Sequence, residues 1–204
     1  ERNHCSSSGG VIWNIDSSGY FYLKKDSRTL INDSLYFHEL ATDNRNDILV
    51  YKERDTEFNL SISLSRTKKR LFLQISKTES NEYRFLDLER NNFELTLFEK
   101  RRNKHIYYID DSPDEFFILS NKNCKNNFAL YTTELNIFDS SKWKIFKRHK
   151  KDELLEDFQV FKNHVVLETW KKGLPQLLFI NKKNNKESYV EFKDSAYAAN
   201  LSYN

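Results

Sequence analysis

Histidine and cysteine side chains, with the serine hydroxyls, are the groups in this chain best suited to acid–base or nucleophilic chemistry. A Ser-His-Asp centre needs a serine within hydrogen-bond reach of a histidine that a carboxylate orients. A common frame for such a serine is the G-x-S-x-G turn, and no two of the four glycines have that spacing. The glycine spacing also excludes a P-loop and a G-x-G-x-x-G dinucleotide fingerprint. We therefore predict no catalytic residue and no cofactor-binding residue in the chain.

The histidines and tryptophans have structural interpretations from their positions. We expect His38, His105 and His164 to lie in strands, with rings that bond to neighbouring backbone groups. His4 and His149 are expected to face water. The three tryptophans fall on predicted strands, where core packing is the usual role of an indole ring. They are Trp13, Trp143 and Trp170.

Metal binding requires several histidine, cysteine or carboxylate ligands at close spacing. Cys5 and Cys124 stand 119 positions apart without a C-x-x-C motif, and the adjacent His4 and Cys5 are only a weak signal. The acidic segment 110–115 lacks the glycine and the ligand spacing of an EF-hand loop. We predict no metal site and no cofactor, and we interpret 110–115 as a polar turn between two strands.

Two basic runs, at residues 100–104 and 147–151, stand one repeat apart in the sequence. Each joins the last strand of one predicted group to the first strand of the next, so the repeat places both on one face. The chain has 33 basic and 30 acidic residues, a net charge of +3, and acidic residues flank both runs. We interpret this face as solvated or inter-domain and expect no nucleic-acid partner, polyanion binding being the less favoured alternative.

Nearly every readable segment has the pattern of a β-strand: four to seven residues rich in aromatic and branched side chains, ended by turn residues. The strands fall into four groups of four, and the tightest turn follows the first strand of each group. No segment sustains a 3.6-residue apolar period, although residues 152–158 have room for one helical turn. The groups span residues 11–52, 58–98, 105–147 and 157–192, after a poorly ordered lead-in at 1–10 and before the start of a further group at 196–204.

The spacing of these groups indicates the fold. Units of four antiparallel strands that recur about every 47 to 52 residues are what a β-propeller blade requires. A single four-stranded sheet exposes two faces, and stacking blades buries those faces against one another. Two successive β-sandwiches are the alternative, but they do not produce this repeat. We predict an all-β fold, a β-propeller fragment of about four four-stranded antiparallel blades that occupies residues 11–204.

Several motifs stand in one register along this repeat. They are DILVYKERDTEF at 47–58, HIYYID at 105–110, FFILSN at 116–121, NFALY at 127–131, LLEDFQVF at 154–161, VVLE at 165–168 and GL at 173–174. Together they resemble the propeller domain of oligopeptidase B, in the prolyl oligopeptidase family of serine peptidases. The chain departs from that family's pattern at Ile106 (usually Glu), at Asp157 (usually Gly) and at 168–170 (usually Glu-Arg before the Gly-Leu pair).

This resemblance implies a seven-bladed propeller that covers a C-terminal α/β-hydrolase domain and limits access to short basic peptides, cleaved after Arg or Lys. The catalytic triad of such an enzyme lies in the hydrolase domain. The chain would then be about four of seven blades, inactive by itself, with the hydrolase domain and short peptides as its partners. The alternative is a stand-alone propeller module that binds a protein or peptide partner.

The chain contains no methionine, so we expect it to be processed or to be a piece of a longer protein. No apolar run approaches 18 residues and no signal-peptide pattern is present, which indicates a cytoplasmic location and no membrane partner. Four blades leave two sheet faces uncovered unless they close into a ring. We therefore expect self-association through the open blade edges.

Overall fold

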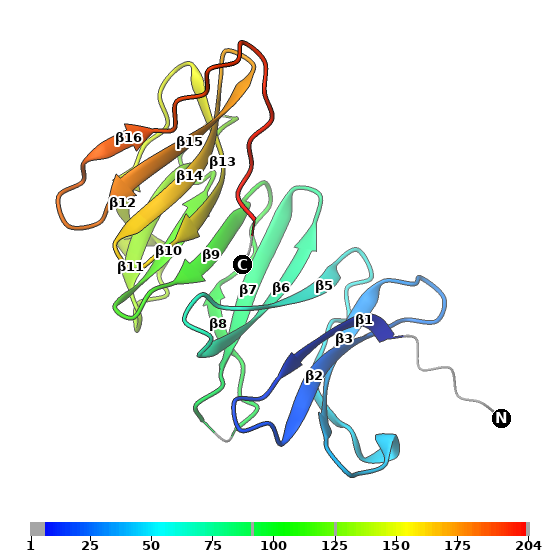
Figure 1. Cartoon of the computed structure of the whole chain (residues 1–204). Coiled ribbons are helices and arrows are strands. Elements are labelled where there is room, and N and C mark those ends of the chain that lie inside the picture. Colours follow the sequence, from blue (N-terminus) through cyan, green and yellow to red (C-terminus); the bar gives the residue numbers. More distant parts are fainter. Residues whose placement is uncertain (1–6, 91, 125, 203–204) are drawn as a thin grey trace. The chain divides into compact units, whose positions relative to one another are not determined.

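The structure is a computed structural model that describes residues 7–90, 92–124 and 126–202. It divides into two compact units, one ending at Lys104 and the other beginning at His105, and each contains two four-stranded antiparallel sheets. In every sheet each strand pairs with the strand that precedes it in the sequence (Figure 1). The fold is therefore all-β, as predicted, and each sheet has the strand order of a propeller blade.

The first unit holds sheets one and two. Sheet one contains β1 (Ser7–Trp13), β2 (Gly19–Lys25), β3 (Asn32–Glu39) and β4 (Ile48–Lys52), with the short 3-10 helix η1 (Asn44–Asn46) before β4. Sheet two contains β5 (Asn59–Leu64), β6 (Arg70–Lys77), β7 (Ser80–Asp87) and β8 (Thr96–Glu99).

The second unit holds sheets three and four. Sheet three contains β9 (Tyr107–Asp111), β10 (Glu115–Ser120), β11 (Ala129–Glu134) and β12 (Lys144–Lys147), with the 3-10 helix η2 (Ser140–Lys142) before β12. Sheet four contains β13 (Glu153–Val160), β14 (His164–Lys171), β15 (Leu174–Asn181) and β16 (Glu187–Tyr189). No helix in residues 7–90, 92–124 and 126–202 has the length and apolar character to cross a membrane.

In each unit a hydrophobic core forms where the two sheets face each other. In the first unit Phe21 and Leu23 of β2 pack with Leu71 and Leu73 of β6, and all four side chains are at most 3% exposed. The second core has the same construction: Phe117 and other residues of sheet three pack against sheet four. Because alternate residues of a strand point to opposite faces, the apolar residues at every second position suffice to build these cores.

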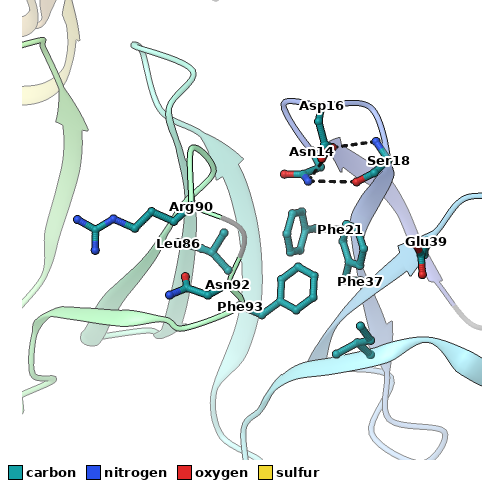
Figure 2. A pocket seen from close by; sticks show the side chains of 11 residues that line it. Asn14, Asp16, Ser18, Phe21, Phe37, Glu39, Leu86, Arg90, Asn92 and Phe93 are labelled. Atoms are coloured by element: carbon teal, nitrogen blue, oxygen red, sulfur yellow. Dashed lines mark hydrogen bonds between the residues drawn. The ribbon is translucent and has the colours of Figure 1, made fainter.

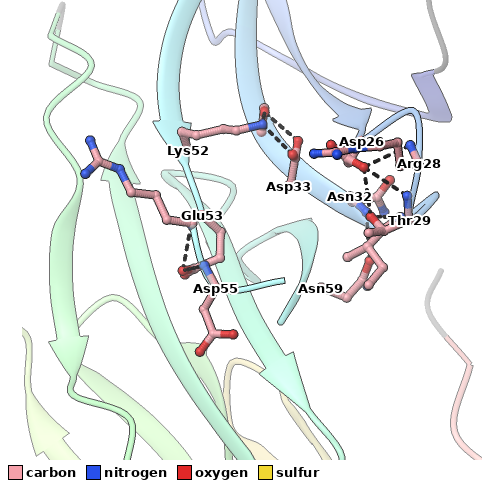
Figure 3. A network of polar contacts seen from close by, with 12 residues as sticks. Asp26, Arg28, Thr29, Asn32, Asp33, Lys52, Glu53, Asp55 and Asn59 are labelled. Atoms are coloured by element: carbon pink, nitrogen blue, oxygen red, sulfur yellow. Dashed lines mark hydrogen bonds and ion pairs between the residues drawn. The ribbon is translucent and has the colours of Figure 1, made fainter. Parts of the chain in front are cut away.

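An asparagine links the two sheets of each unit. The side-chain amide of Asn32, at the start of β3, donates to the carbonyl of Leu60 in β5 (3.1 Å), and the backbone N–H of Asn32 donates to the side chain of Asn59 (Figure 3). Asn127, just before β11, bonds to the first strand of sheet four in a similar way. Its amide donates to the carbonyl of Glu153 (2.8 Å) and its oxygen accepts the N–H of Leu155 (3.1 Å). We call these two residues the asparagine clips.

The structure differs from the predicted boundaries near both ends of the chain. β1 begins at Ser7, so residues 7–10 of the expected lead-in belong to a strand, while residues 1–6 lie outside the described part of the chain. Serine and glycine carry no apolar pattern, and this part of the strand is defined by its backbone pairing with β2. In the described part of 196–204, which ends at residue 202, no strand forms.

The single helical turn for which residues 152–158 have room does not form, because β13 begins at Glu153 and includes the rest of this segment. Within it Glu153 is buried while Leu154 is 39% exposed, and a register shift interrupts the strand between Leu155 and Asp157. A buried carboxylate and an exposed leucine invert the usual strand pattern. Because of this inversion, the apolar periodicity of the sequence does not predict the start of this strand.

Gly19, at the start of β2, allows a close approach that a larger residue would block. A Cβ atom at this position would lie 2.2 Å from the backbone oxygen of His38 and 2.5 Å from Cζ of Phe37. We expect Gly19→Ala to lower the free energy of unfolding by about 1–3 kcal/mol, the usual cost of overpacking. Urea denaturation of the 204-residue chain measures this difference.

Gly10→Ala is the matched control, because a Cβ at Gly10 meets no atom within 4 Å. It should leave the unfolding midpoint nearly unchanged. Equal midpoints for both variants would contradict the close packing around Gly19.

Candidate functional site

Two histidines form the kind of pair that catalytic sites use, in two different sheets. In sheet three, Nε2 of His105 lies 3.0 Å from the hydroxyl oxygen of Ser120. In sheet one, Nδ1 of His38 lies 2.7 Å from one carboxylate oxygen of Asp47, and the other oxygen accepts a hydrogen bond from the hydroxyl of Tyr22. Ser120 is completely buried, so no substrate carbonyl can reach its oxygen. Neither pair therefore makes a nucleophilic centre in this chain.

His164 lies 3.4 Å from the side-chain amide of Asn181, so each of the three histidines that we expected in strands contacts a side chain. His38 and His164 lie in β3 and β14 as predicted, whereas His105 precedes β9. His149, which we expected to face water, instead donates from Nδ1 to the backbone oxygen of Phe128 (3.1 Å). His4 lies outside the described residues.

Only one of the three tryptophans is a core residue. Trp143, just before β12, is 7% exposed and packs among aromatic rings, as predicted. Trp13 is 52% exposed and Trp170 is 39% exposed, so core packing was wrong for these two. Both lie on sheet faces that point away from the core of their unit, a difference that composition cannot reveal.

The first basic run contributes an arginine to a charged network between sheets one and two. The guanidinium of Arg101 lies 2.7 Å from a carboxylate oxygen of Glu53 and 3.0 Å from one of Glu82. It also lies 4.2 Å from the centroid of the Phe58 ring. The carboxylates are nearly buried, while the Arg101 side chain is 25% exposed. This arginine therefore neutralises two buried negative charges.

Hydrogen bonds fix the ionisation of this network. Burial alone raises the pKa of Glu53. The N–H of Asp55 (Figure 3) and the guanidinium of Arg101 outweigh burial and leave that pKa below its ordinary value of 4.5. Burial and then the negative charge of Glu53 raise the pKa of Tyr51 to about 12, so its hydroxyl remains a donor to that carboxylate.

The second basic run makes an equivalent connection in the other unit. Lys147 is 9% exposed, and its ammonium lies 2.6 Å from a carboxylate oxygen of Glu187 in β16. The ammonium of Lys150 lies 5.8 Å from the centroid of the Tyr189 ring. Arg101 and Arg102 of the first run and Lys147 of the second are thus paired with carboxylates inside their own units. A surface for polyanions would need these cations exposed.

The acidic segment 110–115 forms a strand end and a turn. Asp110 and Asp111 end β9 and are buried, whereas Asp114 in the turn is exposed. Ser112 closes the turn, because its N–H and its hydroxyl both donate to the backbone oxygen of Glu115. In the part of the chain that the structure describes, no group of three or more histidine, cysteine, aspartate or glutamate side chains is placed to hold a metal ion.

A pocket of about 290 Å³ opens between sheets one and two (Figure 2). Its floor is formed by the rings of Phe21, Phe37 and Phe93, whose centroids lie 4.7–5.8 Å apart. The turn between β1 and β2 and the segments after β3 and β7 supply a polar rim. The lining residues are Asn14, Asp16, Ser18, Phe21, Phe37, Glu39, Ile48, Leu86, Arg90, Asn92 and Phe93.

A second cavity, of about 530 Å³, lies in the other unit and has a different chemistry. Its lining comes from three turns and is polar and mainly basic. The lining residues are Asp114, Lys162, Asn163, His164, Asn181, Lys182, Lys183 and Asn184. The sequence predicted neither cavity. The only local signal for the first was Phe93, an aromatic residue that we placed in a strand but that precedes β8 and packs against the core.

Comparison with known proteins gives a family match over nearly the whole chain. The model of the family described as "Prolyl oligopeptidase, N-terminal beta-propeller domain" matches residues 2–204. Dipeptidyl aminopeptidase BI of Pseudoxanthomonas mexicana is 29% identical over 95% of this chain and 27% of that protein. Protease 2 of Moraxella lacunata is 27% identical over 72% of this chain and 21% of that protein.

A solved structure shows the same fold. Oligopeptidase B from Leishmania major superposes with a TM-score of 0.87 at 20% identity, over 93% of this chain and 28% of that chain. The chain thus spans about a quarter of the length of the relatives and the structure that it matches.

Removal of Arg101 should destabilise the first unit. Arg101→Ala leaves the buried carboxylate of Glu53 without its cation and leaves Glu82 paired with Arg84 alone, and we expect a loss of about 3 kcal/mol in the free energy of unfolding. Arg45→Ala removes an 87% exposed arginine from its pair with Asp43 and should cost at most about 1 kcal/mol. Equal losses in the two variants would contradict the role of Arg101.

The network should also weaken in acid. A carboxyl whose pKa is lowered by folding stabilises the folded chain above its ordinary pKa of 4.5, and that contribution is lost as pH falls through the lowered value. We expect Glu53→Gln to be less stable than the unmodified chain at pH 7, with the difference shrinking below pH 4.5. Denaturant titrations from pH 7 to pH 3 measure it. A difference that stays constant over this range would refute the assignment.

Proposed function

Because the chain belongs to the prolyl oligopeptidase family, as its N-terminal β-propeller domain, we propose that it is the non-catalytic propeller part of a serine oligopeptidase. In this role the propeller covers the active site of a hydrolase domain and admits only short peptides. The observation that carries the proposal is the family match over residues 2–204, together with four sheets that each have the strand order of a blade.

Two further observations support a catalytic centre outside this chain. The chain contains no G-x-S-x-G turn. Ser120, the serine that lies next to His105 in the described part of the chain, is completely buried. The relatives that it resembles carry peptidase names and are about three and a half times as long. The catalytic serine, aspartate and histidine would therefore be supplied by a C-terminal α/β-hydrolase domain.

The finer parts of the proposal concern specificity and assembly. We propose that the whole enzyme hydrolyses short peptides after Arg or Lys, that its propeller has seven blades, and that it acts in the cytoplasm. These features rest on the resemblance of motifs such as 47–58 and 105–110 to oligopeptidase B.

Sheet one presents an apolar row that suits a further blade or a second copy. Val11, Tyr22, Tyr36 and Leu49 face one another across β1 to β4, on the face opposite the core. Val11 is 49% exposed and Leu49 is 51% exposed, and Trp13 beside them contacts Tyr20 edge-on. We propose that this row drives self-association of the 204-residue chain, since exposed apolar faces of this kind are interaction surfaces.

Activity measurements test the main proposal. The 204-residue chain should not cleave an amide bond after Arg or Lys, whereas the full-length protein should, with turnover blocked by a serine-directed inhibitor. Turnover by the 204-residue chain that the same inhibitor blocks would overturn the proposal. A stop codon directly after Asn204 would instead favour a stand-alone binding module.

Self-association has its own test in sedimentation velocity. Trp13→Ser combined with Leu49→Ser should shift the chain toward monomer at a concentration where the unmodified chain self-associates, because it removes apolar area from the row. Leu30→Asn is the control: Leu30 is 67% exposed in a turn away from the row, and asparagine tolerates its positive φ of 59°. A compact monomer at all concentrations would rule the proposal out.

A further inference from the structure

The pocket between sheets one and two combines an apolar floor with a negative rim. Figure 2 shows the rings of Phe21, Phe37 and Phe93 facing one another below the turn that carries Asp16. Phe21 is completely buried and Phe37 is 4% exposed, so the apolar surface open to a ligand is that of Phe93, which is half-buried, and of Ile48, which is 44% exposed. A ligand that covers the apolar surface of an open pocket removes that surface from water, and this burial favours binding.

The carboxylates of this rim have no cation of their own. None of the ion pairs of the described residues includes Asp16 or Glu39. Arg90, the cation among the described lining residues, is paired with Asp87, its Nε lying 3.3 Å from a carboxylate oxygen. The pocket is therefore open to a positive ligand from outside.

The turn holds one of these carboxylates in place. One oxygen of Asp16 accepts the N–H of Ser18 and the side-chain amide of Asn14, both at 2.9 Å. Hydrogen bonds from Ser18 and then from Asn14 lower the pKa of Asp16, which is therefore ionised at neutral pH. The charge has a fixed position at the rim.

We propose that this pocket binds a peptide segment in which an arginine or lysine stands next to an apolar side chain. The apolar side chain would cover Ile48 and the accessible part of Phe93, and the cation would pair with Asp16 and Glu39. Hydrogen bonds between a cation and a carboxylate are stronger than neutral ones, so the rim favours a basic side chain. A volume of about 290 Å³ accommodates one or two side chains, which excludes a folded domain as the bound group.

Binding of a peptide in this pocket is separate from the peptidase role, because it needs no hydrolase domain and involves no cleavage. Its counterpart is the second cavity, whose lysines give it the opposite charge. That cavity should not bind the same peptide, and it offers a control site within the same chain.

The test is calorimetric titration of the 204-residue chain with acetyl-Phe-Arg-amide. The capped peptide has the guanidinium as its only charge, and the citrulline analogue has the same shape without that charge. We expect saturable binding of the arginine peptide and at least about tenfold weaker binding of the citrulline peptide. The difference should shrink as salt is added, because the rim is exposed to solvent.

Variants assign the binding to the pocket. Asp16→Asn combined with Glu39→Gln keeps the shape of both side chains, and asparagine can still make the turn. This variant should bind the arginine peptide at least about tenfold more weakly, while its far-ultraviolet circular dichroism remains that of the unmodified chain. Asp114→Asn, in the second cavity, should leave the affinity unchanged.

Three results would overturn the proposal: equal affinity for the arginine and citrulline peptides, an unchanged affinity in the double variant, or no saturable binding up to about 10 mM, since a millimolar dissociation constant is already weak binding. None of them would affect the proposed peptidase role, which the activity measurements test separately.

Discussion

Burial of one sheet face against the next is the interaction on which the whole structure depends. An isolated four-stranded sheet would leave apolar side chains such as Phe21 and Leu71 in water, and each contributes about 1.5–3 kcal/mol when buried. The chain meets this requirement in pairs of sheets, one pair in each unit. Polar contacts then fix how the paired sheets align, through the asparagine clips and through Arg101 and Lys147. The pocket in the first unit borders this shared core, since its lining includes Phe21 and Phe37 of the core and Phe93, which packs against it.

The strands could be predicted because their apolar residues alternate and their turns are short. β6 is typical, with Leu71, Leu73 and Ile75 at every second position and all in the core. Prediction failed where backbone pairing rather than side-chain pattern defines the strand. Ser7 to Gly10 have no apolar signal, and Glu153 and Leu154 invert the expected burial. The repeat itself could be predicted, because each group of strands builds one complete sheet.

Long-range pairing could not be predicted in the same way. Arg101 belongs to a basic run that suggests an exposed face, yet its partners Glu53 and Glu82 stand 48 and 19 positions before it. The histidine partners Asp47 and Ser120 were missed for the same reason, since nothing local indicates which side chain lies opposite a strand residue. The pocket also depends on contacts between sheets, because its floor joins β2, β3 and a segment before β8. Sequence patterns report which face of a strand is buried, but not which distant residue meets it.

The asparagine clips have a consequence for how such a chain can be enlarged. Each clip takes its asparagine from near the third strand of one sheet and its partners from the first strand of the next. A gene segment that encodes the two sheets of one unit therefore carries both halves of its clip. Tandem duplication of that segment would reproduce the clip together with the core that it joins. A break between the third strand of one sheet and the first strand of the next would separate the asparagine from its partners, so the module that can be inherited intact is the pair of sheets.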